Sequence, residues 1–327
     1  MEKMRAARYV ERGRIVCEQA VVPALNTGEV LVRTQLSAIC GSDLHVVYDD
    51  MSYMPHPCPH GYPGHEGLGE VVESKSPLFK PGAKVLTCPT GPFARCFADY
   101  QVLPAEQCYE LPPYKGSAEH LLMAQQFGTT IFALRQMPSD VVGKNVMVMG
   151  QGSAGNFFAY YLRRSGAAKV IVSDKSEARL AASKVFGADV ALKADPATVK
   201  EAVLEHTNGQ GVDYLVEAVG HSDSFLQAVD LVREKGHMLW FGLPDTKNPI
   251  QFNFHDFFRK KLRTYSTFGA QLEPNGASFR LALDLIAKGE IDVTKMVTHR
   301  FSIEQIDKAL RVAFDRSDNA LKVAVTF

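Results

Sequence analysis

The sequence has no surplus of charge of either sign. Its 36 Lys and Arg residues balance 36 Asp and Glu residues, whereas a protein that follows a phosphate backbone normally carries a basic surplus or stripe. Long apolar runs are also missing, because no stretch reaches the roughly 18 residues that a transmembrane helix needs. The charged opening residues do not have the pattern of a signal peptide. We therefore expect a cytoplasmic protein that binds neither nucleic acid nor a membrane.

Cysteine is scarce as well. Six Cys in 327 residues do not make the dense framework of a disulfide-stabilised secreted protein, so reduced thiols in a cytosolic enzyme are the better interpretation. No internal repeat or low-complexity tract is present. Hydrophobic residues make up 46% and charged residues 22% of the chain, as in ordinary globular proteins. The length favours two domains over a single hydrophobic core.

The first 115 residues or so contain short β-type runs that are broken by Gly and Pro. Examples are GEVLVRTQLSAI, GLGEVVES, GAKVLTC and ADYQVLP. This pattern is typical of a compact, strand-rich unit with many turns. The double proline Pro112–Pro113 ends this part of the chain, and a helical segment follows at residues 117–137.

From Asn145 the sequence alternates short apolar strands with amphipathic helices. We predict strands in NVMVMG, KVIVSD, ADVALK, VDYLVEAVG, GHMLWFG and KLRTYSTFG, with helices between the first five. Six strands with intervening helices predict an α/β fold with a doubly wound parallel sheet. After Gly269 a helix near 276–293 is followed by a C-terminal strand, ALKVAVTF, that could return to the first domain.

A glycine-rich turn joins the first strand of this sheet to its first helix. Glycines 150, 152 and 155 form a G-x-G-x-x-G pattern, in which glycine permits a tight turn and a close approach of the backbone to a pyrophosphate at the helix N-terminus. Bare matches to this pattern are often ordinary turns, but here the strand and the helix stand on the correct sides. The predicted dinucleotide-binding residues of this turn are Gly150, Gly152, Ser153, Ala154 and Gly155.

The second strand ends in an acidic residue at the spacing expected for ribose binding. Asp174 lies 174 − 150 = 24 positions after the first glycine, close to the roughly 20 that is typical of such an acid. A carboxylate there accepts hydrogen bonds from both ribose hydroxyls and repels a 2′-phosphate, which favours NAD over NADP. The alternative is that Asp174 caps the next helix. Lys175 and Arg179 follow closely and could weaken the preference for NAD.

Two further residues, Cys40 and His65, are of the types that bind zinc. A thiolate and a neutral imidazole are good zinc ligands, and a catalytic zinc keeps one position open for substrate. Their separation of 25 residues is too long for a zinc finger and suits a site built from two loops. Taken alone, a Cys is usually buried packing and a His a solvated surface residue. Ser42 and His45 strengthen the metal hypothesis, because a hydroxyl and an imidazole at this spacing can pass on the proton of a zinc-bound alcohol.

Together these motifs resemble the zinc-containing medium-chain alcohol dehydrogenase superfamily. The resemblance is carried by CGSDLH, GYPGHEGLGEVV, KPGAKV, GQGSAG, GVDYLVEAVG and VTHRFSIEQIDKAL, in the family's order and over nearly the whole chain. It implies a GroES-like catalytic domain at residues 1–116 and 269–327 and a Rossmann NAD(P)-binding domain at residues 117–268. It also implies a homodimer or homotetramer that associates through the nucleotide-binding domain.

The resemblance extends to individual positions. Cys40 and His65 match zinc ligands, and Ser42 and His45 match the proton relay. Glu66 matches an acid beside the metal. This acid either binds the metal directly or lies next to the residues that bind it. Lys322, near the C-terminus, falls where a basic partner of that acid often stands. The resemblance adds residues that would pack on or line the cofactor, namely Thr129, Ala218, Val219, Gly242, Leu243 and Phe268.

The sequence departs from the family pattern in two places. Gln125 stands where a third protein ligand, Cys or Glu, is expected, and a neutral amide is a poor zinc ligand. Zinc would then be held by Cys40, His65 and Glu66, with Gln125 contacting the metal, a water or the substrate. Only two of the four thiols of a structural zinc site are present, so we predict one catalytic zinc and no structural zinc.

The leading hypothesis is a zinc-dependent dehydrogenase that moves hydride between NAD and a secondary alcohol, polyol or sugar-like substrate. A metal-free enone or quinone reductase of the same superfamily is the first alternative, and the loss of the third ligand favours it. The second alternative is a cofactor-binding protein without turnover. The sequence does not rank the substrates.

Overall fold

The computed structural model describes residues 2–52, 54–267, 269–271 and 273–327, so the predicted cofactor residue Phe268 lies outside the described residues. The chain divides into two compact units. Unit 1 comprises Met1–Gly128 and Gln271–Phe327, and unit 2 comprises Thr129–Ala270. Residues 117–128, which the sequence boundary assigns to the nucleotide-binding domain, group with unit 1.

Unit 2 is built on a six-stranded sheet in which every strand is parallel to its neighbours. The predicted doubly wound sheet is therefore confirmed, and the chain order of the strands reverses direction at β8. The strands, in their order across the sheet, are β10 (Val190–Lys193), β9 (Lys169–Asp174), β8 (Asn145–Met149), β11 (Val212–Glu217), β12 (Val232–Trp240) and β13 (Arg263–Ser266).

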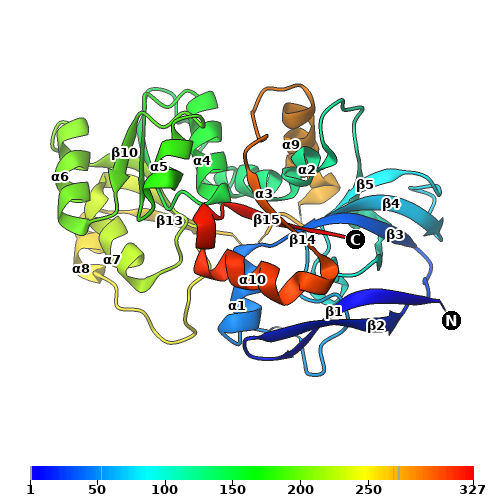
Figure 1. Ribbon diagram of the computed structural model, residues 1–327. Coiled ribbons are helices and arrows are strands. Elements are labelled where there is room, and N and C mark those ends of the chain that lie inside the picture. Colours follow the sequence, from blue (N-terminus) through cyan, green and yellow to red (C-terminus); the bar gives the residue numbers. More distant parts are fainter. Residues whose placement is uncertain (1, 53, 268, 272) are drawn as a thin grey trace. The chain divides into compact units, whose positions relative to one another are not determined.

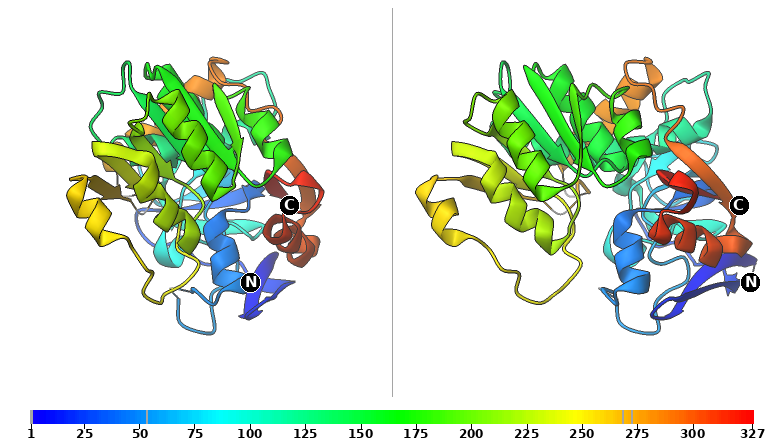
Figure 2. Two further views of the ribbon diagram at one scale, coloured as in Figure 1. Left: turned by 90° about the vertical axis from the view of Figure 1, so that its left-hand side faces the viewer. Right: turned by 60° about the vertical axis from the view of Figure 1, so that its left-hand side comes forward.

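Helices cover both faces of this sheet (Figures 1 and 2). Alternate residues of β8 point to opposite faces, so that Val146 packs with one set of helices and Met147 with the other. Both are fully buried, which explains why the strand reads as an unbroken apolar run. The first set is α4 (Ser153–Arg164) and α5 (Glu177–Ser183), and the second is α6 (Pro196–His206) and α7 (Ser222–Leu231).

One helix boundary differs from the sequence-based expectation. The segment 221–236 reads as a single helix, but α7 ends at Leu231 and strand β12 begins at Val232. The backbone explains the difference, because Lys235 has φ +59°, which is incompatible with a continuing right-handed helix. The pairing of β11 with β12 also shifts register between Val212 and Tyr214, so the start of β12 is irregular.

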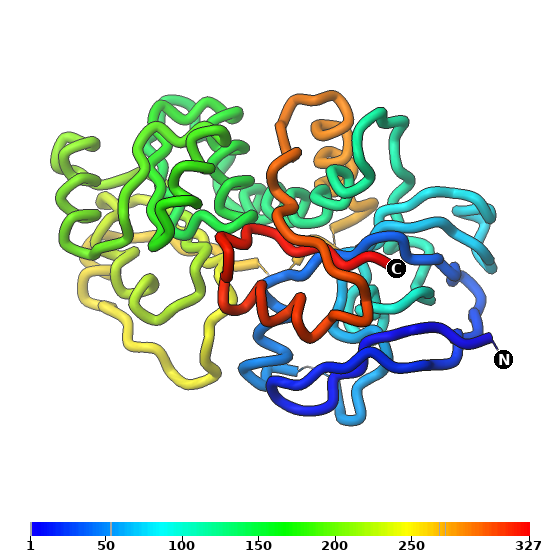
Figure 3. Tube along the Cα trace, in the orientation of Figure 1, coloured from blue at the N-terminus to red at the C-terminus, as the bar shows by residue number. Residues whose placement is uncertain are grey.

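Unit 1 contains a seven-stranded sheet and a separate two-stranded one, β1 (Lys3–Glu11) with β2 (Arg14–Val21). The C-terminal strand β15 pairs antiparallel with β3, where Ala324 faces Ala38. The predicted return of the C-terminus to the first domain is confirmed, and Figure 3 shows it as the red end of the trace beside the blue segment. The larger sheet contains β14 (Val297–Ser302), β15 (Lys322–Thr326), β3 (Glu29–Ala38), β4 (Gly67–Ser74), β5 (Lys84–Thr87) and β7 (Cys108–Glu110), with β6 (Tyr100–Pro104) also paired to β3.

The remaining helices are short. The segment predicted as one helix at 117–137 is divided into α2 (Ala118–Leu122) and α3 (Ala124–Leu134). No helix in the described part of the chain is both long and apolar enough to cross a membrane. The other α-helices are α1 (Gly41–Tyr48), α8 (Phe254–Arg259), α9 (Ala277–Ala287) and α10 (Ile306–Asp315). The short 3-10 helices are η1 (Gly91–Phe93), η2 (Ala105–Gln107), η3 (Pro274–Gly276), η4 (Ile303–Gln305) and η5 (Ser317–Asn319).

Helix α9 packs very closely on the start of α3. A Cβ atom added to Gly128 would lie 2.5 Å from the ring of Phe279, so only glycine permits this approach. Phe279 is fully buried and its ring centroid lies 5.1 Å from that of Tyr109. This contact fixes the part of unit 1 that carries the start of α3.

Replacing Phe279 with Ala should remove about 3–5 kcal/mol of folding free energy, because it leaves a cavity that the close backbones cannot fill. Urea unfolding followed by circular dichroism measures the loss. The control is Leu78→Ala, since Leu78 is 59% exposed and should change the stability by less than about 0.5 kcal/mol. Equal effects of the two changes would contradict the packing argument.

Candidate active site

The predicted metal ligands come from the ends of two neighbouring strands of unit 1. Cys40 follows β3 and is the N-cap of α1, while His65 immediately precedes Glu66 and β4. Strands β3 and β4 are antiparallel, and Ser37 pairs with Gly67. This pairing brings the two segments together although 25 residues separate Cys40 from His65.

The structure places one ligand atom each from Cys40, His65 and Glu66 within 4.8 Å of one another. Tetrahedral zinc holds its ligand atoms about 3.5 Å apart, given Zn–S near 2.3 Å and Zn–N and Zn–O near 2.1 Å. A small inward movement would therefore let these three atoms bind one ion. Within the residues that the structure describes, they are the one such group of three or more His, Cys, Asp or Glu.

Asp43 contacts two of the predicted ligands, Cys40 and His65, and was not among the residues predicted from the sequence. Its Oδ2 accepts a hydrogen bond of 2.9 Å from the backbone N–H of Cys40, and its Oδ1 lies 3.0 Å from Nδ1 of His65. A carboxylate on Nδ1 leaves Nε2 as the nitrogen that can bind a metal. Burial lowers the pKa of His65, but Asp43 and Cys40 outweigh it and raise that pKa well above 6.5.

Glu66 is fully buried and paired with Lys322 of β15. The Lys322 ammonium lies 2.9 Å from Oε1 and 2.6 Å from Oε2 of Glu66. Burial lowers the pKa of Lys322, and the nearby Glu66 carboxylate more than reverses this effect, so the net pKa is raised. Both carboxylate oxygens of Glu66 contact the ammonium.

The proposed proton relay begins beside the metal ligands. The hydroxyl oxygen of Ser42 lies 3.4 Å from Nε2 of His65, the nitrogen that faces away from Asp43. His45 is three residues further along α1 and so lies on the same face of the helix as Ser42. Its Nδ1 is 2.7 Å from Oδ2 of Asp49. Asp49 is thus a partner of His45 that was not among the residues predicted from the sequence.

Gln125 and Thr129 lie one turn apart on α3. Gln125, which the family resemblance aligns with a third metal ligand, is 3% exposed, and Thr129 is half-buried. Residues four apart share a helix face, so the predicted metal-side and nicotinamide-side contacts belong to one surface of α3. Gln125 groups with unit 1 and Thr129 with unit 2.

Cys88 and Cys96 are buried thiols outside the metal-ligand group. Burial raises the pKa of Cys96 to about 12 and that of Cys88 well above its usual value, which keeps both protonated. The Cys96 thiol lies 3.2 Å from Oε1 of Gln101 and 3.6 Å from the hydroxyl of Thr87. Packing and hydrogen bonding account for these two residues.

The glycine-rich turn of unit 2 has the form that dinucleotide binding requires. Gly150 has φ +87°, which glycine adopts readily. A Cβ atom on Gly155 would lie 1.9 Å from the carbonyl oxygen of Gly150, whereas one on Gly152 would meet nothing closer than 3.9 Å. Gly155 therefore permits the tight turn, and Gly152 leaves open space at the N-terminus of α4, where Ser153 and Ala154 begin the helix.

Asp174, at the end of β9, ties this turn to the sheet. Its Oδ2 accepts a hydrogen bond of 2.7 Å from the backbone N–H of Gln151, and its Oδ1 accepts one of 2.7 Å from Ser176. The N-cap of α5 is Ser176, so capping does not explain Asp174. Lys175 is exposed, and a Nη atom of Arg179 is the group nearest to the open space at Gly152.

A second buried acid, Glu217 at the end of β11, organises the other predicted cofactor loops. Its Oε1 accepts hydrogen bonds from the backbone of Val219 and Gly220 and from the hydroxyl of Ser224, at 2.7–3.0 Å. Its Oε2 lies so close to Gly242 that a Cβ atom there would be only 2.6 Å away. Burial raises the pKa of Glu217, and these hydrogen bonds oppose the rise.

The loops that Glu217 holds contain four of the predicted cofactor residues. A Cβ atom on Gly220 would lie 2.2 Å from the carbonyl oxygen of Leu243, so the loops after β11 and β12 are in direct contact. Val219 is 41% exposed, and Ala218, Gly242 and Leu243 are half-buried. The acid at the end of the apolar run VDYLVE is the sequence signal for this role, and Glu217 was not among the residues predicted from the sequence.

Two protein-family models match the chain. The alcohol dehydrogenase GroES-like domain matches residues 26–113, and the zinc-binding dehydrogenase model matches residues 154–288. Sorbitol dehydrogenase of Bacillus subtilis is 28% identical and covers 99% of this chain and 97% of its own length. L-threonine 3-dehydrogenase of Photorhabdus laumondii is 27% identical, and the match covers 93% of this chain and 94% of that protein.

Solved structures share the fold along the whole chain. 2R,3R-butanediol dehydrogenase of Bacillus subtilis superposes with a TM-score of 0.84 at 22% identity, and 99% of each chain is covered. A zinc-binding dehydrogenase of Sinorhizobium meliloti bound to NADP gives a TM-score of 0.83 at 23% identity, with 100% of each chain covered. On the two family models and the matched dehydrogenase sequences, the chain belongs to the zinc-containing medium-chain alcohol dehydrogenase superfamily, and it is an NAD(P)-dependent oxidoreductase.

Proposed function

We propose that this enzyme uses one zinc ion and NAD to interconvert a secondary alcohol, polyol or sugar-like substrate and its carbonyl product. The convergence of Cys40, His65 and Glu66 within 4.8 Å carries the proposal, because a metal-free reductase has no use for a half-buried thiol and imidazole that meet beside a buried carboxylate. The names of the relatives support the substrate class, since they include a sorbitol and a threonine dehydrogenase.

We assign the catalytic role to unit 1 and the NAD(P)-binding role to unit 2. Zinc, when bound, polarises the substrate hydroxyl and lowers its pKa, and nicotinamide accepts the hydride. Cys40 and His65 would hold the metal, and Asp43 fixes the imidazole nitrogen that faces it. Glu66 is either a third ligand or a charged neighbour that Lys322 neutralises, and buried Gln125 would contact the metal, a water or the substrate.

The chain's own groups account for proton transfer and cofactor orientation. Ser42 and His45 take the hydroxyl proton towards solvent. The open N-terminus of α4 at Gly152 would receive the pyrophosphate, and Asp174 would accept from the ribose hydroxyls, which favours NAD. Arg179, beside the same space, is the residue through which a 2′-phosphate could still bind.

Changing Cys40 to Ser should remove the zinc and the activity together, because an alcohol is a far weaker zinc ligand than a thiolate. Metal analysis of the purified protein should find one zinc ion per chain in the wild type and much less in the variant. A spectrophotometric screen of polyols and secondary alcohols with NAD+ and NADP+ measures turnover and coenzyme preference. Cys17→Ser and Cys88→Ala are the controls, and both should retain the zinc. A wild type without zinc that reduces enones would support the metal-free alternative.

Alanine substitutions at Gly155 and Gly152 should have different effects, one on folding stability and the other on cofactor binding. Gly155→Ala should cost about 1–3 kcal/mol of folding free energy through the clash with Gly150. Gly152→Ala should change stability by less than about 1 kcal/mol and weaken NADH binding about tenfold, which corresponds to about 1.4 kcal/mol. Urea unfolding and NADH fluorescence titration are the two measurements. Unchanged NADH affinity in Gly152→Ala would contradict the assigned pyrophosphate site.

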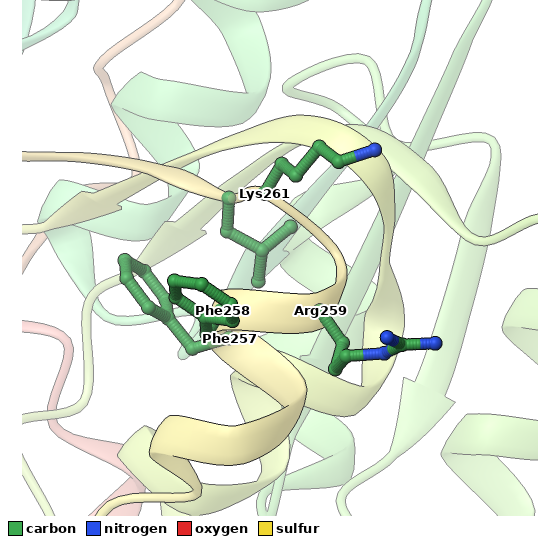
Figure 4. A pocket seen from close by; sticks show the side chains of 5 residues that line it. Phe257, Phe258, Arg259 and Lys261 are labelled. Carbon is green, nitrogen blue, oxygen red and sulfur yellow. The ribbon is translucent and has the colours of Figure 1, made fainter.

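We further propose a cytoplasmic homo-oligomer that forms through unit 2. Phe254 and Phe258 on α8 are 65% and 69% exposed, and exposed apolar groups of this size often mark an interface. Figure 4 shows the rings of Phe257 and Phe258 together at a hollow that Arg259 and Lys261 also line. The neighbouring β13 is an edge strand with one paired side.

Phe258→Ser should lower the assembly mass towards that of one chain, because it removes apolar area from the contact. Light scattering coupled to size-exclusion chromatography measures the mass. The control is Val185→Ser, since Val185 is also 69% exposed but lies away from α8 in the sequence. If both variants keep the wild-type mass, α8 does not form the contact.

A further inference from the structure

His45 has a partner that the proton relay described above does not use. Its Nδ1 lies 2.7 Å from Oδ2 of Asp49, four residues later at the end of α1. The two side chains are 21% and 26% exposed, so each of them reaches solvent. Residues four apart on a helix face one another, and a distance of 2.7 Å is that of a charge-assisted hydrogen bond.

The end of α1 fixes both partners. The backbone carbonyl of His45 accepts hydrogen bonds of 3.1 Å from the N–H groups of Asp49 and Met51. Asp50 then takes a left-handed conformation with φ +55°, and the chain leaves the helix. Because Asp49 is the C-cap residue, the helix end fixes its backbone one turn from that of His45.

This contact determines which nitrogen of His45 carries a proton. An ionised carboxylate only accepts hydrogen bonds, so Nδ1 must be the donor. In the neutral ring the other nitrogen, Nε2, is then the acceptor. A relay that removes a proton from the Ser42 side needs an acceptor, and the opposite tautomer would present an N–H group instead. The carboxylate also stabilises the imidazolium that forms when Nε2 takes the proton.

We propose that Asp49 is a positioning residue of the proton relay, which holds His45 in the Nδ1–H form with Nε2 as the proton acceptor. The inference rests on the proposed dehydrogenase function. For each alcohol oxidised, the C–H bond supplies a hydride to NAD+ and the O–H bond supplies a proton. That proton reaches Nε2 of His45 through Ser42, and the imidazolium then releases a proton to water, so one proton leaves for each hydride transferred.

The first test reads the tautomer directly and does not require turnover. Nitrogen-15 NMR of histidine-labelled protein distinguishes Nδ1–H from Nε2–H, and His45→Gln identifies the His45 signal among the ten His residues. The wild type should show the Nδ1–H form. Asp49→Asn should move His45 towards the Nε2–H form, because an amide can donate to Nδ1. The matched control is Asp50→Asn, the same change at the adjacent exposed residue.

The second test measures catalysis. Asp49→Asn should lower kcat about tenfold or more, in the range seen when a partner that orients an imidazole is lost. It should leave KM within about twofold and raise the solvent deuterium isotope effect on kcat, since proton transfer becomes limiting. Asp49→Glu should restore part of kcat, and Asp50→Asn should match the wild type.

The outcomes separate this inference from the proposed function. An unchanged His45 tautomer in Asp49→Asn, or an unchanged kcat, overturns the role of Asp49. Absence of alcohol oxidation by the wild type overturns the dehydrogenase proposal, and with it the relay. A shifted tautomer with reduced kcat and an unchanged KM supports the role, because a purely structural defect would lower the fraction of active enzyme without changing the isotope effect.

Discussion

The metal-ligand site depends on one buried carboxylate, that of Asp43. It contacts the backbone of Cys40 through one oxygen and the imidazole of His65 through the other, and it is 1% exposed. A buried carboxylate is costly without hydrogen-bonding or charged neighbours, and Asp43 has one such neighbour in each of the two segments that carry Cys40 and His65. The pairing of β3 with β4 brings the loops together, and Asp43 fixes the orientation of the side chains within them. Lys322, on the C-terminal strand, contacts both carboxylate oxygens of Glu66 and so fixes its orientation. This contact requires the C-terminal strand to return to the sheet of unit 1.

In unit 2, buried carboxylates hold loops in place by accepting hydrogen bonds from backbone N–H groups. Loops that receive a cofactor at the carboxyl ends of parallel strands have N–H groups without partners in the sheet. Asp174 at the end of β9 and Glu217 at the end of β11 accept several of these N–H groups at 2.7–3.0 Å. Each carboxylate therefore shapes a loop as well as standing beside the proposed cofactor site. Rigid loops lower the entropic cost of binding a flexible dinucleotide.

Periodicity was sufficient to predict most of the fold. Apolar runs flanked by glycine predicted the six parallel strands, and the alternation in ALKVAVTF predicted a strand that reaches β3. The prediction failed at residues 232–236, where the strand begins within an apparently helical run because Lys235 takes a left-handed conformation, which composition does not reveal. The sequence also pointed to Cys40 and His65 as candidate metal ligands, which the structure brings together with Glu66, since Cys and His are rare and chemically distinctive. Asp43, Asp49 and Glu217 escaped notice because common acids act here through backbone N–H groups and ring nitrogens, and only coordinates show those contacts.

The neutral side chain of Gln125 suits the charges that the proposed metal site would contain. Asp43 and Glu66 are almost fully buried, and Lys322 supplies a single compensating ammonium. With a thiolate at Cys40 and a divalent ion bound, the negative and positive charges of this group are equal. A third anionic ligand at position 125 would leave a net buried negative charge, which the protein interior disfavours. A neutral amide at that position keeps the balance, and it leaves the ion less neutralised and so a stronger electrophile for the substrate hydroxyl. In this chain the loss of the third ligand is therefore consistent with a working metal site.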